Sequence, residues 1–186
     1  GDNVIIGGSA SQDLAAHVAE ELNDDLCYVE TKKFPDGERY LRVDGNIDEE
    51  VTVIQSTGYP QDENLMELLF LIANLKDLGA KKVRVVVPYM GYARQEKRFH
   101  DGEAISAKIV ANLIQSAGAD EFITFNIHEK CVLDFFDIPT TNISAMGAIA
   151  EYIDEKLDEK PLIVAPDKGA YPFAQEIAEI LDCECT

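Results

Sequence analysis

The sequence predicts an α/β fold in which helices cover both faces of a mostly parallel sheet. Short runs of β-branched, apolar residues alternate with amphipathic stretches of helical length along almost all 186 residues. Apolar residues make up 46% of the chain, which is enough for a sizeable core. Because no linker, low-complexity tract or short-period repeat interrupts the alternation, we expect residues 1–186 to form one domain.

The first half of the chain predicts four extended segments and two helices. Leu14, Val18 and Leu22 recur at helical spacing in the first helix, and Leu65, Leu68, Leu69 and Ile72 do so in the second. Pro35-Asp36-Gly37 is a turn sequence between two extended arms, and Gly79 is suited to end the second helix. In chain order the segments are strand 3–9, helix 11–23, extended arms 26–31 and 32–43, strand 51–56 and helix 63–80.

The second half predicts further strands that alternate with helices. The run KVRVVVPYM is β-branched and continuous until Pro88, which is typical of a buried strand. In chain order the segments are strand 82–90, helix 103–119, strand 121–128, a short strand and a helix within 140–157, and a strand, turn and helix within 161–181.

The charge of the chain argues against nucleic acid as a partner. Asp and Glu number 35 against 16 Lys and Arg, giving a formal net charge of −19, whereas binding to nucleic acid depends on Lys and Arg that neutralise phosphates. No apolar run approaches the roughly 20 residues of a transmembrane helix. The first residues lack the pattern of a secretory signal. We therefore expect a cytoplasmic protein without nucleic-acid or membrane partners.

The four cysteines predict thiols rather than a metal site. Cys27 and Cys131 are isolated in apolar, strand-like stretches, and Cys183 and Cys185 form a single C-x-C. Zinc sites usually pair two C-x2-C knuckles, and no second knuckle is present. We expect buried, reduced thiols.

A cationic segment follows the strand 82–90 and is out of character with the acidic chain. Arg94, Lys97, Arg98 and His100 fall within seven residues, just before a predicted helix. Ligands bind outside the carboxyl ends of parallel strands, and Arg and Lys match phosphate oxygens there. The alternative is a solvated surface loop. Tyr89, Tyr92 and Phe99 argue against that alternative, although they are also suited to pack the loop down.

Two further side chains follow predicted strands. His128 is suited to ligate a metal, transfer a proton or cap the strand with a hydrogen bond. Asp167 is suited to a metal or a sugar hydroxyl, or to cap the following helix. Taken together at one sheet edge beside an anion-binding loop, the pair suggests Mg²⁺ bound with a polyphosphate.

Two turns have less specific patterns. The turn FPDGER is consistent with a simple hairpin, in which Phe34 either joins the core or offers a surface for a flat ring. The turn GGSAS after the first strand is similar to a phosphate-binding turn, but it lacks both the P-loop and the GxGxxG pattern.

Taken together, several stretches resemble the ribose-phosphate pyrophosphokinase family. They occur in the family's order and cover nearly the whole chain, and FPDGE and PYMGYARQ are specific signatures. The matching stretches are KKFPDGER (32–39), the run from Val53 to Arg98, GEAISAKIVANLI (102–114), NIHEKCVLDFFDIP (126–139) and VAPDKGA (164–170).

The resemblance implies a phosphoribosyltransferase-like domain with a protruding β-hairpin flag. It also implies transfer of the diphosphoryl group of Mg-ATP to the 1-hydroxyl of ribose 5-phosphate, which yields phosphoribosyl pyrophosphate and AMP for nucleotide biosynthesis. The enzyme would be a homo-oligomer in which each ATP site is shared between subunits. Phe34 would stack on adenine, and Asp36, Gly37 and Glu38 would bond around it. Arg94 and Gln95 would contact ATP, and His128 and Asp167 would be associated with Mg²⁺.

One departure from the family concerns length. The resemblance implies a second, similar domain with an acidic, Thr-Gly-Gly ribose-phosphate loop, and catalytic Lys and Arg on a segment expected beyond Thr186. We therefore expect an N-terminal part that is inactive by itself. The alternatives are a non-catalytic regulatory protein of the same fold and a stand-alone phosphoribosyltransferase. The intact FPDGE, Arg94-Gln95, His128 and Asp167 favour the enzyme over the regulator.

Overall fold

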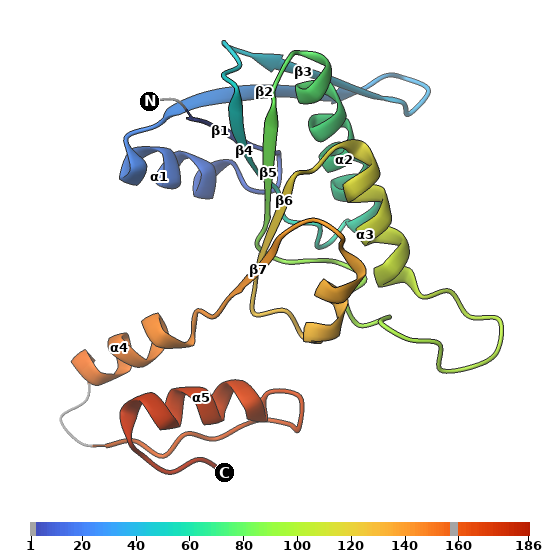
Figure 1. Cartoon of the computed structure of the whole chain (residues 1–186). Coiled ribbons are helices and arrows are strands. Elements are labelled where there is room, and N and C mark those ends of the chain that lie inside the picture. The colour runs from blue at the N-terminus through green and yellow to red at the C-terminus, as the bar shows by residue number, and fades with distance from the viewer. Residues whose placement is uncertain (1–2, 157–159) are drawn as a thin grey trace. The chain divides into compact units, whose positions relative to one another are not determined.

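The computed structural model describes residues 3–156 and 160–186 and divides the chain into two compact units. The first unit extends to Asn142, and the second runs from Ile143 to Thr186. The predicted assignment of residues 1–186 to one domain stays a prediction. The predicted α/β class is confirmed, because a mostly parallel sheet with helices forms (Figure 1).

The sheet has seven strands in the order β3-β2-β1-β4-β5-β6-β7. The pairs β2–β1, β1–β4, β4–β5 and β5–β6 are parallel. Strands β2 and β3 form an antiparallel hairpin, as the turn sequence predicted. The strands are β1 (Asn3–Gly7), β2 (Asp25–Lys33), β3 (Arg39–Asp44), β4 (Glu50–Ile54), β5 (Lys82–Val87), β6 (Glu121–Phe125) and β7 (Thr140–Ile143). The helices of this unit are α1 (Gln12–Leu22), α2 (Gln61–Asp77), α3 (Ser106–Ala117) and the 3-10 helix η1 (Lys130–Phe135).

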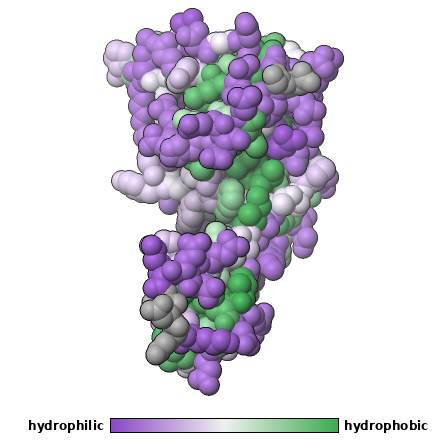
Figure 2. Space-filling view, turned by 90° about the vertical axis from the view of Figure 1, so that its left-hand side faces the viewer, coloured by the Kyte–Doolittle hydropathy of each residue, from purple (hydrophilic) through white to green (hydrophobic). Residues whose placement is uncertain are grey.

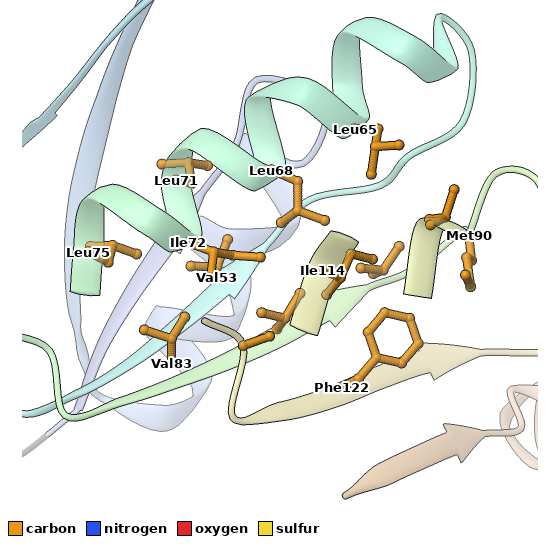
Figure 3. Close-up of a cluster of buried hydrophobic side chains, with 14 of the residues drawn as sticks. Val53, Leu65, Leu68, Leu71, Ile72, Leu75, Val83, Met90, Ile114 and Phe122 are labelled. Carbon is orange, nitrogen blue, oxygen red and sulfur yellow. The ribbon is translucent and has the colours of Figure 1, made fainter. Parts of the chain in front are cut away.

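The main core lies between the sheet and the helices α2 and α3 (Figure 3). Alternate strand residues point to opposite faces, so Val4 and Ile6 of β1 join this core while Ile5 packs on the other face with α1. Helix α2 buries Leu65, Leu68 and Ile72, as its spacing predicted. Leu69 is only half-buried. Helix α2 ends at Asp77, and Gly79 follows with a φ of +105°, which suits the predicted glycine cap.

Of the predicted α1 face, Val18 packs partly buried against the second core cluster, but the two leucines do not. Ala15 and Ala19 are buried, whereas Leu14 and Leu22 are 40% and 59% exposed. The physical reason is a close approach: a Cβ built on Gly7 would lie 2.7 Å from the Cβ of Ala15. Small residues therefore face the sheet, and the larger leucines lie at the helix flanks.

The second unit contains α4 (Met146–Lys156) and α5 (Tyr171–Leu181). The predicted strand at 161–165 is wrong, because the segment forms only an isolated parallel bridge from Ile163 to Cys185. The N–H of Ile163 donates to the C=O of Glu184, and Ala165 donates to Thr186. The predicted end of the preceding helix at Leu157 lies outside the described residues.

The cysteines are free, but the expectation of burial holds only in part. Cys27 is buried, and burial, followed by the charges of Asp25, Asp48 and Asp44, raises the pKa of its thiol. The expectation is wrong for Cys131, which is exposed because its segment forms η1 instead of a strand. Cys183 and Cys185 are half-buried.

The surface is consistent with the acidic composition. Hydrophilic side chains predominate on the face seen in Figure 2, with hydrophobic surface between them. No helix among the described residues is long and apolar enough to cross a membrane.

Candidate functional site

The hairpin of β2 and β3 ends in an exposed turn that carries the first group of predicted site residues. The N–H of Phe34 donates to the C=O of Glu38 at 2.8 Å, and the N–H of Gly37 donates to the C=O of Phe34 at 2.8 Å. The Asp36 carboxylate accepts the N–H of Glu38 at 3.1 Å. Gly37 has a φ of +94°, a conformation that glycine adopts without a steric penalty. The turn is therefore fixed by its own backbone and by Asp36.

Phe34 presents its ring at this turn. Its side chain is 44% exposed, and the ring lies edge-on to Tyr40 with centroids 5.9 Å apart. Of the two alternatives for Phe34, the structure excludes the core and leaves an open aromatic surface. Such a surface is suited to stack on a flat ring.

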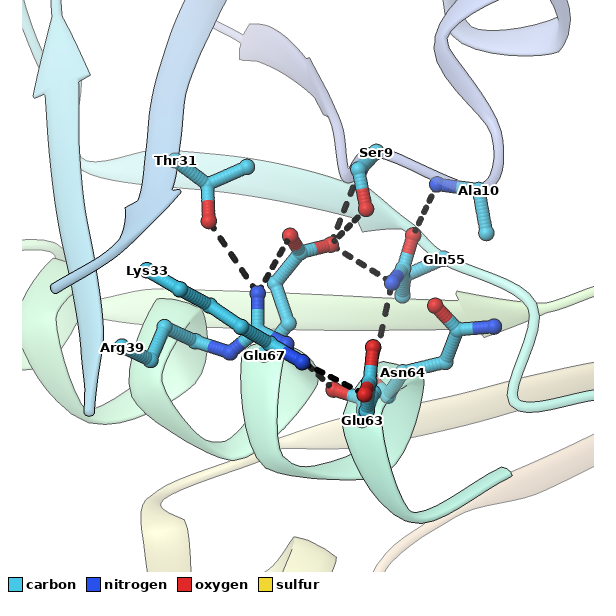
Figure 4. Close-up of polar contacts among 9 residues, drawn as sticks. All are labelled: Ser9, Ala10, Thr31, Lys33, Arg39, Gln55, Glu63, Asn64 and Glu67. Carbon is cyan, nitrogen blue, oxygen red and sulfur yellow. Dashed lines mark hydrogen bonds and ion pairs between the residues drawn. The ribbon is translucent and has the colours of Figure 1, made fainter. Parts of the chain in front are cut away.

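Two ion pairs connect the base of the hairpin to α2 (Figure 4). Lys33 Nζ lies 2.5 Å from Glu63, and this hydrogen bond, together with the charge of Lys33, lowers the pKa of Glu63. Arg39 Nη1 lies 3.2 Å from Oε1 of the buried Glu67. The helical spacing of Leu65, Leu68 and Ile72 predicted packing and gave no role to Glu67. A carboxylate inside a run of buried leucines was the available signal.

The cationic segment begins on a tightly packed backbone after β5. The N–H of Gly91 donates to the hydroxyl of Thr57 at 3.0 Å, and a Cβ at Gly91 would lie 2.2 Å from the Thr57 carbonyl oxygen. The next residue, Tyr92, has a φ of +67° and donates its hydroxyl to Asp62. That hydrogen bond raises the pKa of Tyr92. The segment is thus pinned to the loop after β4 and to the start of α2.

Arg94 and Gln95 follow directly and are exposed. Arg39, Arg42, Arg84 and Arg98 all have hydrogen-bond or ion-pair partners. Within the described part of the chain, Arg94 is the one arginine without such a partner. Gln95 accepts the hydroxyl of Ser106 at 2.5 Å, and its C=O accepts the N–H of Ala107, which places it at the first turn of α3.

Two of the other cations, Arg98 and Lys97, have contacts within the loop. Arg98 Nε donates to the C=O of Glu103 at 2.7 Å, and the Glu103 carboxylate accepts the N–H groups of Phe99 and His100. Lys97 lies over the ring of Phe99, 5.1 Å from its centroid. Among the arginines of the segment, Arg98 is therefore engaged within the loop, and Arg94 has its guanidinium exposed without a described partner.

His128 lies beyond the end of β6 and is exposed. Its Nδ1 is 3.3 Å from the Glu129 carboxylate, with both side chains nearly half exposed. The N–H of Ile127 just before it donates to the Asn142 side chain at 3.0 Å. The bond to Asn142 thus fixes the backbone after β6. The His128 imidazole that follows is exposed to solvent and lies beside the Glu129 carboxylate.

Asp167 lies in the second unit, in the turn before α5. Its carboxylate accepts the N–H of Ala170 at 2.9 Å, which closes the turn before the helix. Ala170 and not Asp167 is the N-cap residue of α5, so the capping alternative is wrong. One carboxylate oxygen has no described hydrogen bond and remains available. Because His128 and Asp167 belong to different units, the predicted magnesium pair stays a prediction.

A Mg²⁺ ion bound with a nucleotide needs few protein ligands, and the exposed Asp167 carboxylate fits that need. The described residues contain no group of three or more His, Cys, Asp or Glu that could hold a metal ion. Mg²⁺ at phosphoryl-transfer sites is held by one or two carboxylates, with phosphate and water oxygens as the remaining ligands. An exposed Asp167 is compatible with that arrangement.

The turn GGSAS is used internally. The N–H of Ser9 donates to Glu67 at 2.8 Å, and the N–H of Ala10 donates to Gln55 at 3.1 Å. A Cβ at Gly8 would lie 2.2 Å from the Gln55 side-chain oxygen, so a side chain there would displace Gln55 from its bond to Ala10. Two of the N–H groups that a phosphate would need are already bonded.

Comparison with known proteins gives a consistent result. The N-terminal domain of ribose phosphate pyrophosphokinase matches residues 3–118 of the chain. The ribose-phosphate pyrophosphokinase of Methanobrevibacter smithii is 97% identical over 183 residues, which cover 98% of this chain and 61% of that protein. The ribose-phosphate pyrophosphokinase of Methanothermobacter thermautotrophicus is 63% identical over 182 residues, which cover 98% of this chain and 63% of that protein.

A solved structure shares the fold. The crystal structure of phosphoribosylpyrophosphate synthetase from Mycobacterium smegmatis aligns with a TM-score of 0.90 at 32% identity, over 100% of this chain and 63% of that chain. The chain spans about three fifths of the length of these relatives.

Proposed function

This chain belongs to the ribose-phosphate pyrophosphokinase family, and on that premise we propose an activity for the protein at the full length of its relatives. It is a cytoplasmic transferase that moves the diphosphoryl group of Mg-ATP to the 1-hydroxyl of ribose 5-phosphate. The bond between the β-phosphorus of ATP and the oxygen that bridges it to the α-phosphorus breaks. A bond from the 1-oxygen of the ribose to the β-phosphorus forms, and the hydroxyl proton is released. The products are AMP and phosphoribosyl pyrophosphate, a precursor for nucleotide biosynthesis.

The observation that carries the proposal is the unpaired, exposed Arg94 on a pinned backbone. An arginine fork forms charge-assisted hydrogen bonds with phosphate oxygens, and here no described acidic side chain competes for it. Phosphoryl-type transfer depends mainly on positioning and on neutralising charge. Arg94 would therefore bind the polyphosphate, with Gln95 beside it as a second contact to ATP.

The exposed turn supports a role in base recognition. Phe34 would stack on adenine with its open ring. The side chains and backbone of Asp36, Gly37 and Glu38 would hydrogen-bond around the base. We propose that the turn serves the ATP site of a neighbouring subunit, so that the enzyme is a homo-oligomer with shared sites.

Asp167 and His128 would hold the Mg²⁺ that accompanies ATP. The bound ion would supply additional neutralisation of the phosphate charge. The Glu129 carboxylate, 3.3 Å from His128 Nδ1, would orient the imidazole for this role.

The test is product formation by the full-length enzyme. Incubation with Mg-ATP and ribose 5-phosphate should give AMP and phosphoribosyl pyrophosphate in equal amounts, measured by phosphorus NMR. Residues 1–186 alone should form neither product, because the ribose 5-phosphate site is expected elsewhere in the protein. If the full-length protein forms no product but changes the rate of a separate active synthetase, the regulatory alternative replaces this proposal.

A further inference from the structure

We infer that Glu67 is a positioning residue that fixes the β2–β3 hairpin against α2, so that the turn 34–38 meets the nucleotide base in one orientation. The inference rests on the proposed function for its consequence in catalysis. Its geometric part rests only on the contacts described below. Glu67 itself lies within the protein and is not expected to touch ATP.

Glu67 is fully buried and saturated with hydrogen bonds. Its side chain has an exposed fraction of 0%. Oε2 accepts the N–H and the hydroxyl of Ser9, both at 2.8 Å, and the side-chain amide of Gln55 at 2.6 Å. Oε1 accepts Arg39 Nη1 at 3.2 Å. A buried carboxylate requires such partners. Here they come from three separate segments, which are the turn after β1, the end of β4 and strand β3.

Arg39 connects this carboxylate to both strands of the hairpin. It lies on β3, opposite Lys33 of β2. Its Nη1 also donates to the hydroxyl of Thr31 on β2 at 3.1 Å, and its Nη2 donates to the C=O of Glu63 on α2 at 3.2 Å. Its side chain is only 13% exposed. One planar guanidinium therefore ties β2, β3 and α2 together with directional bonds (Figure 4).

The second link between hairpin and helix differs in kind. Lys33 and Glu63 are each 50% exposed, and a solvated ion pair of this type contributes little and tolerates many geometries. Of these two links, the buried pair is therefore the one with a fixed geometry, and we assign to it the orientation of the hairpin end relative to α2. The turn 34–38 begins directly after Lys33 and ends directly before Arg39, so a change at Arg39 is transmitted to Phe34 over a few residues.

If Glu67 and Arg39 have a purely structural role, their variants should only be less stable. If they position the turn, their variants should also recognise the nucleotide base differently. In the full-length enzyme, Arg39→Gln should raise the KM for Mg-ATP about tenfold and leave the KM for ribose 5-phosphate within about twofold. The preference for ATP over GTP, measured as the ratio of kcat/KM values, should fall about tenfold. Glu67→Gln should act in the same direction. Lys33→Gln, on the same hairpin, should change each value by less than about twofold.

Hydrogen exchange separates this inference from the proposed function. Arg39→Gln should speed exchange at the N–H groups of Phe34 and Gly37, whereas Lys33→Gln should not, whether or not the protein forms phosphoribosyl pyrophosphate. If Arg39→Gln and Glu67→Gln lower the melting temperature but leave exchange at the turn and the ATP-to-GTP ratio unchanged, Glu67 is structural and the inference is wrong. If Glu67→Gln does not fold, Arg39→Gln decides the question alone.

Discussion

The N–H of Gly91 donates to the hydroxyl of Thr57 at 3.0 Å, and this contact holds the start of the cationic segment on the loop after β4. The two residues are 34 positions apart in the sequence. Their contact leaves no room for a side chain at position 91, because a Cβ there would lie 2.2 Å from the Thr57 carbonyl oxygen. The position of Arg94 therefore depends on a glycine three residues before it.

Gly91→Ala should destabilise the protein, because backbone at both residues must move to admit the methyl group. We expect a loss of about 1–3 kcal/mol in the free energy of unfolding, measured by urea denaturation. Gly147→Ala is the matched control, since nothing lies within 4 Å of a Cβ at that helical position. The control should be neutral or stabilising by up to about 1 kcal/mol. Equal effects of the two variants would contradict the packing argument.

Arg94→Ala should weaken the use of Mg-ATP in the full-length enzyme, because a charge-assisted contact to phosphate is lost. A loss of about 1.5–3 kcal/mol corresponds to a rise in KM for Mg-ATP of roughly 10- to 100-fold. Steady-state kinetics measures it. Lys108→Ala removes an exposed cation on α3 without a described partner and should leave the kinetics unchanged. Unaltered ATP kinetics in Arg94→Ala would remove Arg94 from the site.

Phe34→Ala should lose ATP affinity without losing the fold. The ring is 44% exposed, so little core packing is lost, while stacking on a base is worth about 1–3 kcal/mol. We expect a clear rise in the KM for ATP with a nearly constant melting temperature. Tyr28→Ala is the control, because Tyr28 is a 70% exposed aromatic residue on β2, the strand that leads into the turn, and lies away from the turn itself. A similar rise in both variants would argue against a specific role for Phe34.

Cys131 should react with iodoacetamide much faster than Cys27. Cys131 is exposed, whereas Cys27 is buried and the raised pKa of its thiol leaves less of the reactive thiolate at pH 8. We expect at least about a tenfold difference in rate, measured by mass spectrometry of the labelled peptides. Denaturation in urea should abolish the difference. Fast labelling of Cys27 in the folded protein would contradict the described packing of β2.

The ion pair between Arg84 and Glu121 should stabilise the sheet above about pH 4.5. Burial raises the pKa of Glu121, but the hydrogen bond and charge of Arg84, 2.9 Å away, together with Lys82, outweigh it and lower the pKa below the usual 4.5. The stabilisation is therefore fully present above pH 4.5 and is lost as the pH falls through the lower folded-state pKa.

Glu121→Gln tests this dependence. The variant should be less stable than the parent protein at pH 7 by about 0.5–1 kcal/mol, and the difference should shrink in acid. Urea denaturation at pH 7 and below pH 4 measures it. A difference that is the same at both pH values would show that Glu121 acts through packing and not through its charge.

The local pattern of the sequence was sufficient to predict most strands and helices and the exposed turn of the hairpin. Strand and helix periodicity predicted β5 and α2, and Pro35-Asp36-Gly37 predicted the hairpin, because these features depend on residues a few positions apart. The same reasoning was wrong for the strand at 161–165. Its residues have the right pattern, but strand formation also needs a pairing partner, and there only a single bridge forms.

Tertiary structure decided the features that depend on distant residues. The sequence indicated that residues 94–100 are cationic, but only the folded loop showed that Arg98 bonds to Glu103 and Lys97 lies over Phe99, while Arg94 has no described partner. The sequence placed Glu67 among buried leucines, but its partners Ser9, Gln55 and Arg39 come from three separate segments. Local periodicity cannot encode these contacts, because each depends on which strands become neighbours when the sheet closes around its core.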